Sequence, residues 1–257
     1  MTDTNVELRD GVLWLTIQRP GARNAMTFEM YDVLERTATR ANADASANAL
    51  AITGAGGAFI AGTDIAQFAD FRTPEQAHAY EERMDRVLGA VEAVRKPTIA
   101  AIAGATTGGG LAIAASCDLR IATSSATFGM PIARTLGNCL SLANLMRLSA
   151  LVGIARVKDL IFTARMLGAE EAKAIGLVNE IVADDAALRA RVTELATTMS
   201  GYAPLTLWAT KDGLRRIRER MLPDDGHDLV ALCYTSEDFR EGVRAFMEKR
   251  KPRWTGR

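Results

Sequence analysis

One uncharged segment, residues 97–117, constrains the fold more than any other part of the chain. It reads PTIAAIAGATTGGGLAIAASC. Its apolar residues up to Ile102 predict a buried strand, and residues 111–115 predict a buried helix. The glycines at 108–110 lie between them, where a backbone turns sharply or approaches a ligand closely. A helix that begins there directs unpaired N–H groups and its positive dipole end at the turn, which predicts an oxyanion site.

Two other interpretations of this segment are a glycine turn without a ligand and a membrane span. Four glycines and three threonines disfavour a span, which needs about 20 predominantly apolar residues. A second glycine-bearing loop, residues 54–64, also follows an apolar strand. Dinucleotide binding would require a third glycine where Phe59 stands, and no GK[ST] follows either loop. Neither a nucleotide redox cofactor nor a phosphate-binding loop is therefore expected.

Composition indicates a globular chain with balanced charge. The 257 residues are 48% apolar, enough for a sizeable core, and 31 Lys and Arg balance 31 Asp and Glu. This balance gives no sign of a nucleic-acid or membrane partner. The polar start MTDTNVELRD predicts no secretory signal. Three widely spaced cysteines without a CxxC pattern predict reduced thiols in a cytoplasmic protein, and two histidines disfavour a metal site.

The predicted elements alternate between strands and helices and then become helical. Residues 6–18 predict a hairpin with an Asp10-Gly11 turn, and Thr27 is expected to cap a helix. Residues 49–53 and 118–130 predict strands, and residues 74–94 an amphipathic helix. We expect an α/β core over 1–195 and a C-terminal helical region over 196–257. Apolar residues of that region predict burial between subunits: Leu229, Val230, Leu232 and Phe239.

Five segments, in order along nearly the whole chain, resemble one known family. They are RPGARNAMT (19–27), GAGGAFIAGTDI (54–65), IAAIAGATTGGGLAIAASCDLRIA (99–122), TARMLGAEEAKAIGLVNEIV (163–182) and EGVRAFMEKRKPRW (241–254). Together they resemble the enoyl-CoA hydratase/isomerase, or crotonase, superfamily. The resemblance implies a crotonase-like spiral of ββα units with a C-terminal helical trimerisation region. It also implies a homotrimer or a hexamer of two trimers, and an acyl-CoA substrate that brings coenzyme A with it, so that no separate cofactor is expected.

Carried over residue by residue, the resemblance places an oxyanion hole at the backbone N–H groups of Thr63 and Gly109. The family usually has Ala at position 63, but a backbone donor does not depend on the side chain. Two fixed donors would stabilise the charge that a thioester carbonyl gains as its α-carbon is deprotonated. The same comparison gives coenzyme A contacts to Arg23, Ala61, Asp64, Ile65, Phe246 and Lys249. Asp64 could instead satisfy backbone donors of its turn, and Lys249 could belong to a solvated basic helix end.

The resemblance breaks at the two glutamates with which hydratases of this family activate water. Their positions hold Ala112 and Ile132 here. Between residues 92 and 159 the only acid is Asp118, so an acid would have to come from a distant segment, either Asp64 or the 74–94 helix. Arg134 is a candidate to meet a thioester-derived anion, with a surface ion pair as the alternative. Nearby, Asn138 is expected to cap a helix, and Cys139 to be a buried thiol.

These patterns predict an acyl- or enoyl-CoA processing enzyme that stabilises an enolate-like thioester. Because fold does not decide among the reactions of such a scaffold, hydration, isomerisation, decarboxylation and thioester hydrolysis stay open. A non-catalytic acyl-CoA-binding protein is the alternative from another class. The acyl group and the acid or base are not specified by the sequence.

Overall fold

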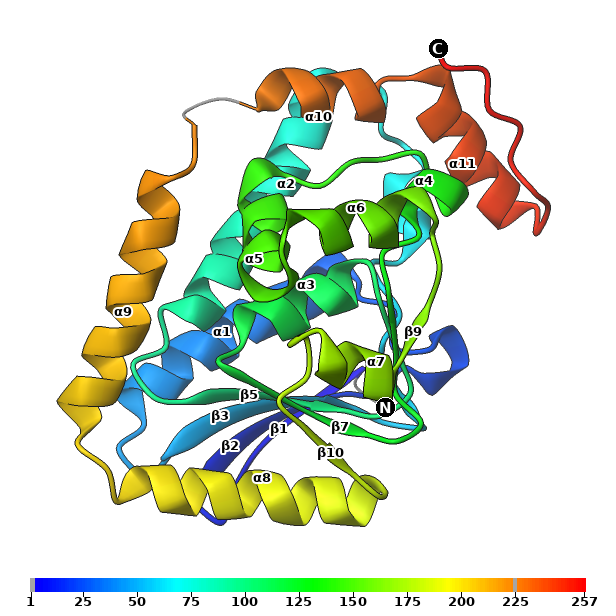
Figure 1. The fold of residues 1–257 in the computed structure, drawn as a ribbon. Coiled ribbons are helices and arrows are strands. Elements are labelled where there is room, and N and C mark those ends of the chain that lie inside the picture. Colours follow the sequence, from blue (N-terminus) through cyan, green and yellow to red (C-terminus); the bar gives the residue numbers. More distant parts are fainter. Residues whose placement is uncertain (1–2, 224–225) are drawn as a thin grey trace.

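The computed structural model describes residues 3–223 and 226–257, which form a mixed α/β fold around a twisted sheet (Figure 1). All neighbouring strands in this sheet are parallel except the first two. In spatial order the six strands are β1 (Thr4–Arg9), β2 (Val12–Ile17), β3 (Ala49–Gly54), β5 (Thr98–Ile102), β7 (Leu119–Thr123) and β10 (Glu180–Val182).

The predicted hairpin is confirmed at the edge of this sheet. β1 pairs antiparallel with β2, and Arg9 lies opposite Val12 across the turn. Asp10 and Gly11 have φ values of 52° and 73°. This left-handed pair matches the twist of two-residue hairpins, which explains why Asp-Gly stands there.

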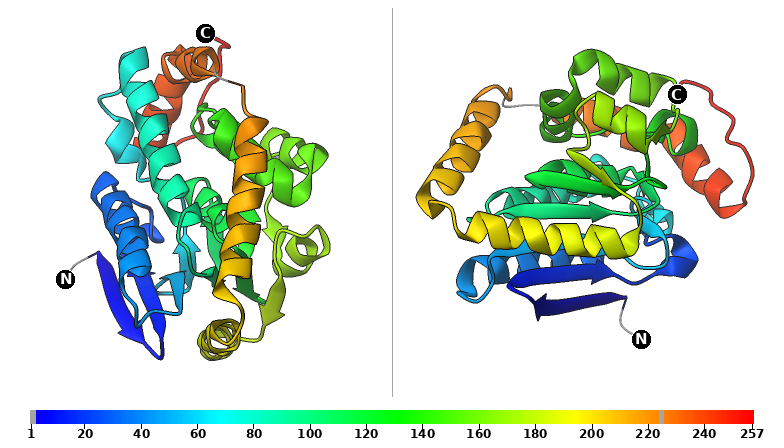
Figure 2. Two further views of the ribbon diagram at one scale, coloured as in Figure 1. Left: turned by 90° about the vertical axis from the view of Figure 1, so that its left-hand side faces the viewer. Right: turned by 60° about the horizontal axis from the view of Figure 1, so that its bottom comes forward.

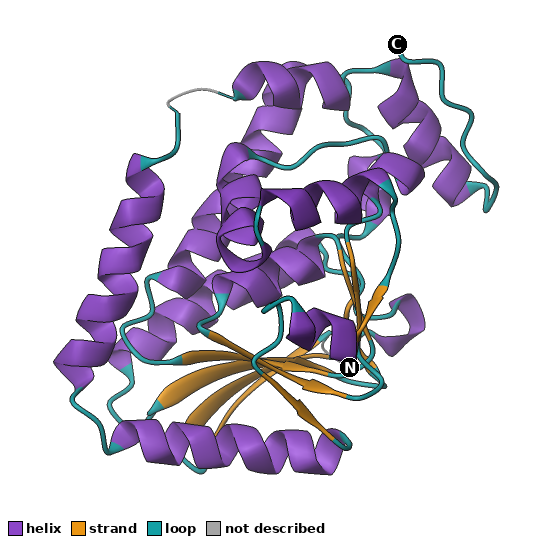
Figure 3. Cartoon of the chain, viewed as in Figure 1, coloured by secondary structure: helices purple, strands orange, loops and turns teal. Residues whose placement is uncertain are grey.

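A second, smaller sheet receives the chain after β3, β5 and β7 of the first one (Figure 3). Its strands are β4 (Ala58–Ile60), β6 (Ala105–Thr107), β8 (Thr127–Gly129) and β9 (Leu167–Gly168). Each passage through the two sheets is followed by a helix: α2 (Pro74–Glu92) after β3 and β4, α3 (Gly109–Ser116) after β5 and β6, and α4 (Ile132–Thr135) after β7 and β8. The expected spiral of ββα units is confirmed. The single strand expected over 118–130 is wrong, because a turn at Ser124 sends its two halves to different sheets.

Helices cover both faces of the large sheet (Figures 1 and 2). On one face α2, α3 and α1 (Phe28–Ala43) pack against Leu15, Ile52 and Ile102. On the other face, Trp14 and Ile99 pack against α8 (Asp185–Ser200). Thr27 caps α1 as predicted, since its side chain accepts from the N–H of Met30. The alternation of sheet residues between two apolar layers explains why these strands read as continuous apolar runs.

The remaining helices follow the sheets. They are η1 (Pro20–Ala22), η2 (Ile65–Phe68), α5 (Leu142–Val152), α6 (Ile154–Phe162), α7 (Ala169–Ala174), α9 (Pro204–Arg220), α10 (His227–Tyr234) and α11 (Glu237–Met247). The boundary predicted at residue 195 falls inside α8, and the helices that follow it pack on the rest of the chain, as Tyr234 and Phe239 do on Phe68. Within the described ranges, no helix is both long and apolar enough to cross a membrane.

Two ion pairs attach α9 to the core. Lys211 Nζ lies 2.7 Å from Asp118 Oδ2, and the Arg218 guanidinium donates to both oxygens of Glu92 at 2.5 and 2.6 Å. Apolar side chains of the same helix line an open groove that α9 forms with α5, with Leu214 64% and Ile217 61% exposed. α9 therefore joins its own chain through charge and leaves an apolar surface uncovered.

Candidate active site

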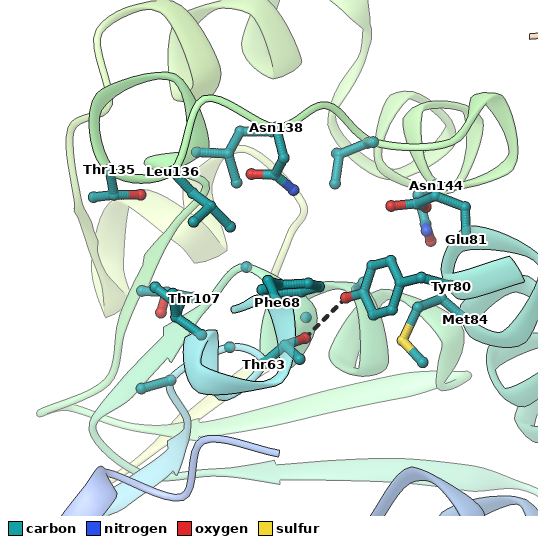
Figure 4. Close-up of a pocket in the computed structure, with 18 of the residues that line it drawn as sticks. Thr63, Phe68, Tyr80, Glu81, Met84, Thr107, Thr135, Leu136, Asn138 and Asn144 are labelled. Atoms are coloured by element: carbon teal, nitrogen blue, oxygen red, sulfur yellow. Dashed lines mark hydrogen bonds between the residues drawn. The ribbon is translucent and has the colours of Figure 1, made fainter. Parts of the chain in front are cut away.

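A cavity of about 120 Å³ lies where the small sheet meets the helices that follow it (Figure 4). α1, α2, α3 and α4 contribute to its wall, together with the chain after β4 and the chain before α5. Most of the lining is apolar: Ile65, Phe68, Met84, Leu88, Ala112, Ile132, Leu136 and Leu140. Polar side chains also contribute to the lining: Tyr31, Thr63, Tyr80, Glu81, Thr107, Thr135, Asn138 and Asn144.

One end carries two backbone N–H groups, those of Thr63 and Gly109. The bridge between Met26 and the chain after β4 uses Gly62 C=O and Asp64 N–H, which leaves Thr63 N–H without an acceptor in the described chain. Gly109 is the first residue of α3, where an N–H has no partner within the helix. A Cβ on Gly109 would lie 3.6 Å from Thr63 N, so the two donors are neighbours.

Glycine is required at this turn for two different reasons. Gly108 has φ 52° and ψ −123°, a conformation that side chains of L residues rarely adopt. Gly109 has no such restriction, but a Cβ there would collide with the hydroxyl of Tyr31. The turn can therefore present its N–H group only while both positions remain glycine.

Two tyrosines, the buried Tyr31 and the half-buried Tyr80, hold Thr63 in place. Its Oγ1 hydrogen-bonds with Tyr31 Oη at 2.8 Å and with Tyr80 Oη at 3.0 Å (Figure 4). Burial raises the pKa of Tyr31 to about 12, against the smaller opposite effect of the Thr63 hydrogen bond, and burial also raises the pKa of Tyr80. Both phenols stay protonated at neutral pH and act as hydrogen-bonding groups. Sequence reasoning missed them, although a threonine beside an apolar cavity requires buried partners for its hydroxyl.

The other end of the cavity contains a buried carboxyl group, Glu81 of α2. Tyr234 Oη of α10 donates to Glu81 Oε1 at 2.5 Å, and Asn138 Nδ2 donates to Tyr234 Oη at 3.2 Å. Burial raises the pKa of Glu81 to about 7; the Tyr234 hydrogen bond lowers it, and nearby Asp85 raises it further. Glu81 and Asn144 lie together, away from Thr107 and Thr63 (Figure 4). Of the two sources of an acid predicted from the sequence, the 74–94 helix contributes one to the cavity, Glu81, and Asp64 does not line it.

The structure brings four other predicted positions to the cavity. Ala112 and Ile132, where glutamates were expected by resemblance, both line it, as do Ala61 and Ile65. Asp64 is outside the lining: its carboxylate accepts from Arg19 Nη1 at 2.7 Å and from Ala66 N–H at 3.1 Å. These bonds give Asp64 the local role that was the alternative for it.

Four candidate residues are not brought to the lining within this chain. Arg23 is exposed after η1, and its C=O accepts from Ala61 N–H at 3.1 Å. Arg134 is exposed on α4, and its side chain does not line the cavity. Phe246 and Lys249 are exposed at the end of α11. The prediction that Arg134 meets a thioester-derived anion in the cavity is therefore not supported within this chain.

The expectation that Asn138 caps a helix is wrong. Ser141 is the N-cap of α5, since its Oγ accepts from Asn144 N–H at 3.2 Å. Asn138 lies three residues earlier, in the cavity wall. The error arose because Asn and Ser are about equally good caps, and only the position of the helix start distinguishes them.

Comparisons with known proteins agree with one another. A family model described as Enoyl-CoA hydratase/isomerase matches residues 7–257. A probable enoyl-CoA hydratase of Mycobacterium bovis is 37% identical over 247 residues, which cover 95% of this chain and 94% of the relative. The short-chain-enoyl-CoA hydratase of Clostridium acetobutylicum is 34% identical over 250 residues, covering 96% and 95%. A structure of methylmalonyl-CoA decarboxylase with 2-nitronate-propionyl-CoA superposes with a TM-score of 0.89 and 28% identity, covering 100% and 99%.

The raised pKa of Glu81 predicts how stability changes with pH. Its pKa is about 7 in the fold and has an ordinary value of 4.5. The folded state therefore holds the proton more tightly, and the stability this gives is complete below about pH 4.5 and lost as the pH rises through 7. In Glu81→Gln, which cannot ionise, the free energy of unfolding relative to wild type should rise by about 2 kcal/mol from pH 5 to 8.

Urea denaturation at fixed protein concentration measures this difference. Glu82→Gln, one residue along α2 with an exposed side chain, is the matched control and should follow the wild type at every pH. Parallel stability curves for Glu81→Gln and wild type would show that Glu81 does not hold its proton more tightly in the fold.

Proposed function

The chain belongs to the enoyl-CoA hydratase/isomerase family, and on that premise we propose that Thr63 and Gly109 bind the thioester carbonyl of a short acyl-CoA. It is an enzyme that processes acyl-CoA thioesters. The observation that supports this carbonyl site is the pair of unpaired N–H groups at one end of an apolar cavity. Two donors fixed by the backbone bind an oxygen more tightly as its negative charge grows.

The proposed chemistry passes through an enolate-like state. When the α-carbon of a thioester gains an electron pair, the charge moves to the carbonyl oxygen that faces Thr63 N–H and Gly109 N–H. Removing one such donor costs about 3–4 kcal/mol of transition-state stabilisation in enzymes of this kind. Tyr31 and Tyr80 would act as positioning residues, because they hold the Thr63 side chain and with it the direction of its N–H group.

The size of the cavity supports a short acyl group. Its volume is about 120 Å³. An apolar protein cavity of about 150 Å³ accommodates benzene, so an acyl chain of about four to six carbons is the size that fits. The coenzyme A part would leave along Ala61 and Ile65, past Arg23. Phe246 and Lys249, exposed at the end of α11, would meet it from a neighbouring subunit.

We propose that hydration is not the main reaction. Water addition needs a group to take the proton of water and a group to protonate the α-carbon, and Ala112 and Ile132 can do neither. A general acid or base commonly contributes about 10²–10⁴-fold. Glu81 lies apart from Thr63, with Tyr80 between them (Figure 4).

Decarboxylation of a 2-carboxyacyl-CoA is a second candidate. It is favoured by the likeness to methylmalonyl-CoA decarboxylase, with its TM-score of 0.89. Loss of CO₂ leaves the electron pair on the α-carbon directly, so that no base is needed there. An oxyanion hole beside apolar Ala112 and Ile132 suits such a step.

We also propose a trimer or a dimer of trimers in the cytoplasm, acting without a separate cofactor. Free thiols at all three cysteines suit a reducing compartment. Val230 and Phe239, expected between subunits, are instead buried within their own chain. Leu232 is 70% exposed, and with Leu214 and Ile217 it offers apolar surface to a neighbouring subunit.

Gly109→Ala tests the carbonyl site. The new methyl group must displace Tyr31 Oη and crowd the space between Gly109 and Thr63, so kcat/KM should fall at least about 100-fold. Gly89→Ala in α2 is the control, because a Cβ there meets nothing within 4 Å. Wild-type turnover by a folded Gly109→Ala variant would contradict the assignment, as would failure of the wild type to bind any acyl-CoA in calorimetry.

A crotonyl-CoA hydration assay tests the proposal that Ala112 and Ile132, in place of glutamates, make hydration slow. Loss of enoyl-thioester absorbance should proceed far below the ordinary enzyme range of about 1–10³ s⁻¹. Introducing both acids, Ala112→Glu with Ile132→Glu, should raise the rate if only these groups are lacking. Fast hydration by the wild type would show that the protein adds water without them.

Light scattering tests the assembly. The chain has a mass of 27.7 kDa, and the solution mass at micromolar concentration should be three or six times this value. Placing a charge in the apolar groove beside α9 by Ile217→Glu should lower it, whereas Arg216→Glu, at a neighbouring exposed position outside the groove, should lower it less. A monomeric wild type would rule out the proposed assembly.

A further inference from the structure

Three hydroxyl groups form a chain beside the proposed carbonyl site. Thr63 Oγ1 lies in the middle, 2.8 Å from Tyr31 Oη and 3.0 Å from Tyr80 Oη (Figure 4). Within residues 3–223 and 226–257 these three hydroxyls make no other hydrogen bond. All three residues line the cavity, and we call their hydroxyls the hydroxyl chain.

The hydroxyl chain contains one more hydrogen than its hydrogen bonds use. Each hydroxyl has one hydrogen to donate and two lone pairs that accept. Two hydrogen bonds join the three groups, so one of the three hydrogens has no acceptor among the described residues, whichever way the bonds are directed. A donor without an acceptor beside an apolar lining is unfavourable, and an oxygen of a ligand in the cavity can pair with it.

The difference in acidity assigns the unused hydrogen to Thr63. The O–H of a phenol is more acidic than that of an aliphatic alcohol, so the phenol is the better donor and the alcohol oxygen the better acceptor. Burial keeps both phenols protonated, because it raises the pKa of Tyr31 to about 12 and also raises the pKa of Tyr80. Thr63 Oγ1 therefore accepts from both tyrosines, and its own O–H stays free.

The free O–H of Thr63 lies close to the two backbone donors. A Cβ on Gly109 would lie 3.1 Å from Thr63 Oγ1 and 3.6 Å from Thr63 N. Standard bond lengths and angles place the nitrogen of Gly109 about 2.5 Å from the same point. Hydrogen bonds of about 2.7–3.2 Å can therefore join one ligand oxygen to all three donors.

A negative oxygen at this site has neutral groups to stabilise it. No Lys, Arg or His side chain lines the cavity in the described chain, and Glu81 contributes an acid to it. The stability of an oxyanion here depends on how many donors point at it, and in an apolar space that excludes water each donor has a large effect. A third donor is thus of more use here than it would be beside a cation.

We propose that the hydroxyl of Thr63 is a third donor to the thioester oxygen and acts as a catalytic residue beside the two backbone N–H groups. This inference rests on the proposed function, because the oxygen meets the hydroxyl only if it is bound by Thr63 N–H and Gly109 N–H. A hydrogen bond to a charged oxygen is about twice as strong as one to a neutral oxygen. The hydroxyl therefore stabilises the enolate-like state more than the bound thioester, which is the condition for raising the rate.

Titration of bound 3-oxobutanoyl-CoA measures this stabilisation without turnover. This four-carbon thioester loses an α-proton to give an enolate, and near-ultraviolet absorbance follows the enolate concentration. Half of the ligand bound to the wild type should be enolate at a lower pH than half of the free ligand. Thr63→Val keeps the shape of the side chain and the backbone N–H, and should raise this midpoint by about one to two pH units, a loss of about 10–100-fold in enolate stabilisation.

Three further variants show whether the hydroxyl acts as a donor. Thr63→Ser retains the O–H and should titrate near the wild type. Tyr80→Phe should raise the midpoint less than Thr63→Val, because Tyr31 still holds Thr63 and the free O–H remains. Thr37→Val is the matched control and should not move the midpoint. Thr37 is buried in the same helix as Tyr31, its Oγ1 donates to Val33 O at 2.7 Å, and it does not line the cavity.

Calorimetry with butanoyl-CoA, which stays neutral, separates the charged state from simple binding. Thr63→Val should weaken binding of butanoyl-CoA by a smaller factor than it weakens the enolate. If Thr63→Val does not fold, Thr63→Ala removes the same hydroxyl and takes its place in both measurements.

An unchanged midpoint in Thr63→Val would overturn the third donor and leave the pair of N–H groups standing. An equally large rise in Thr63→Ser or Tyr80→Phe would also overturn it, since it would assign the effect to the packing of the Thr63 side chain. A wild type that binds neither ligand, or that does not lower the midpoint, would contradict the proposed function as well.

Discussion

The site depends on one close contact between two stretches of backbone. α3 begins so near to β4 that a side chain on Gly110 would collide with the carbonyl of Ile60. This contact brings the first N–H of α3 beside the N–H of Thr63. The spiral supplies the contact, because β4 and β6 are parallel neighbours in the small sheet and both chains leave that sheet in the same direction. The geometry of the proposed carbonyl site is thus a consequence of strand pairing.

Backbone groups form one part of the cavity wall, and side chains form another. One end is made of peptide groups, whose position is set by the fold and hardly by side-chain identity. The other is made of side chains from α2, α10 and the chain before α5, each replaceable by a single mutation. A protein built in this way can keep its means of stabilising charge while its substrate and reaction change. Ala112 and Ile132, which also line the cavity, are side-chain positions of the same kind.

The sequence was sufficient for the parts of the molecule governed by local rules. The Asp10-Gly11 turn, the Thr27 cap and the strand–glycine–helix junction were all predictable from residue type and spacing. It was insufficient where distant segments meet. Tyr31 and Tyr80 look like ordinary apolar positions of two helices until Thr63 is placed between them. Asn138 looks like a helix cap until Tyr234 is placed beside it. Arg134 was predicted to meet an anion in the site, but it is exposed, and a sequence motif does not show whether a side chain is exposed.

The pairing of Glu81 with Tyr234 has a consequence for the way the protein is made. These residues are 153 positions apart, and α10 lies close to the C-terminal end. A ribosome has synthesised both sheets and the glycine turn at residues 108–110 before Tyr234 emerges. Until then Glu81, Phe68 and Ala77 have no α10 or α11 to cover them. The growing chain therefore exposes Phe68 and the rings it contacts, Phe71 and Tyr80, until α10 and α11 are made. That interval is when chaperones have most reason to bind it.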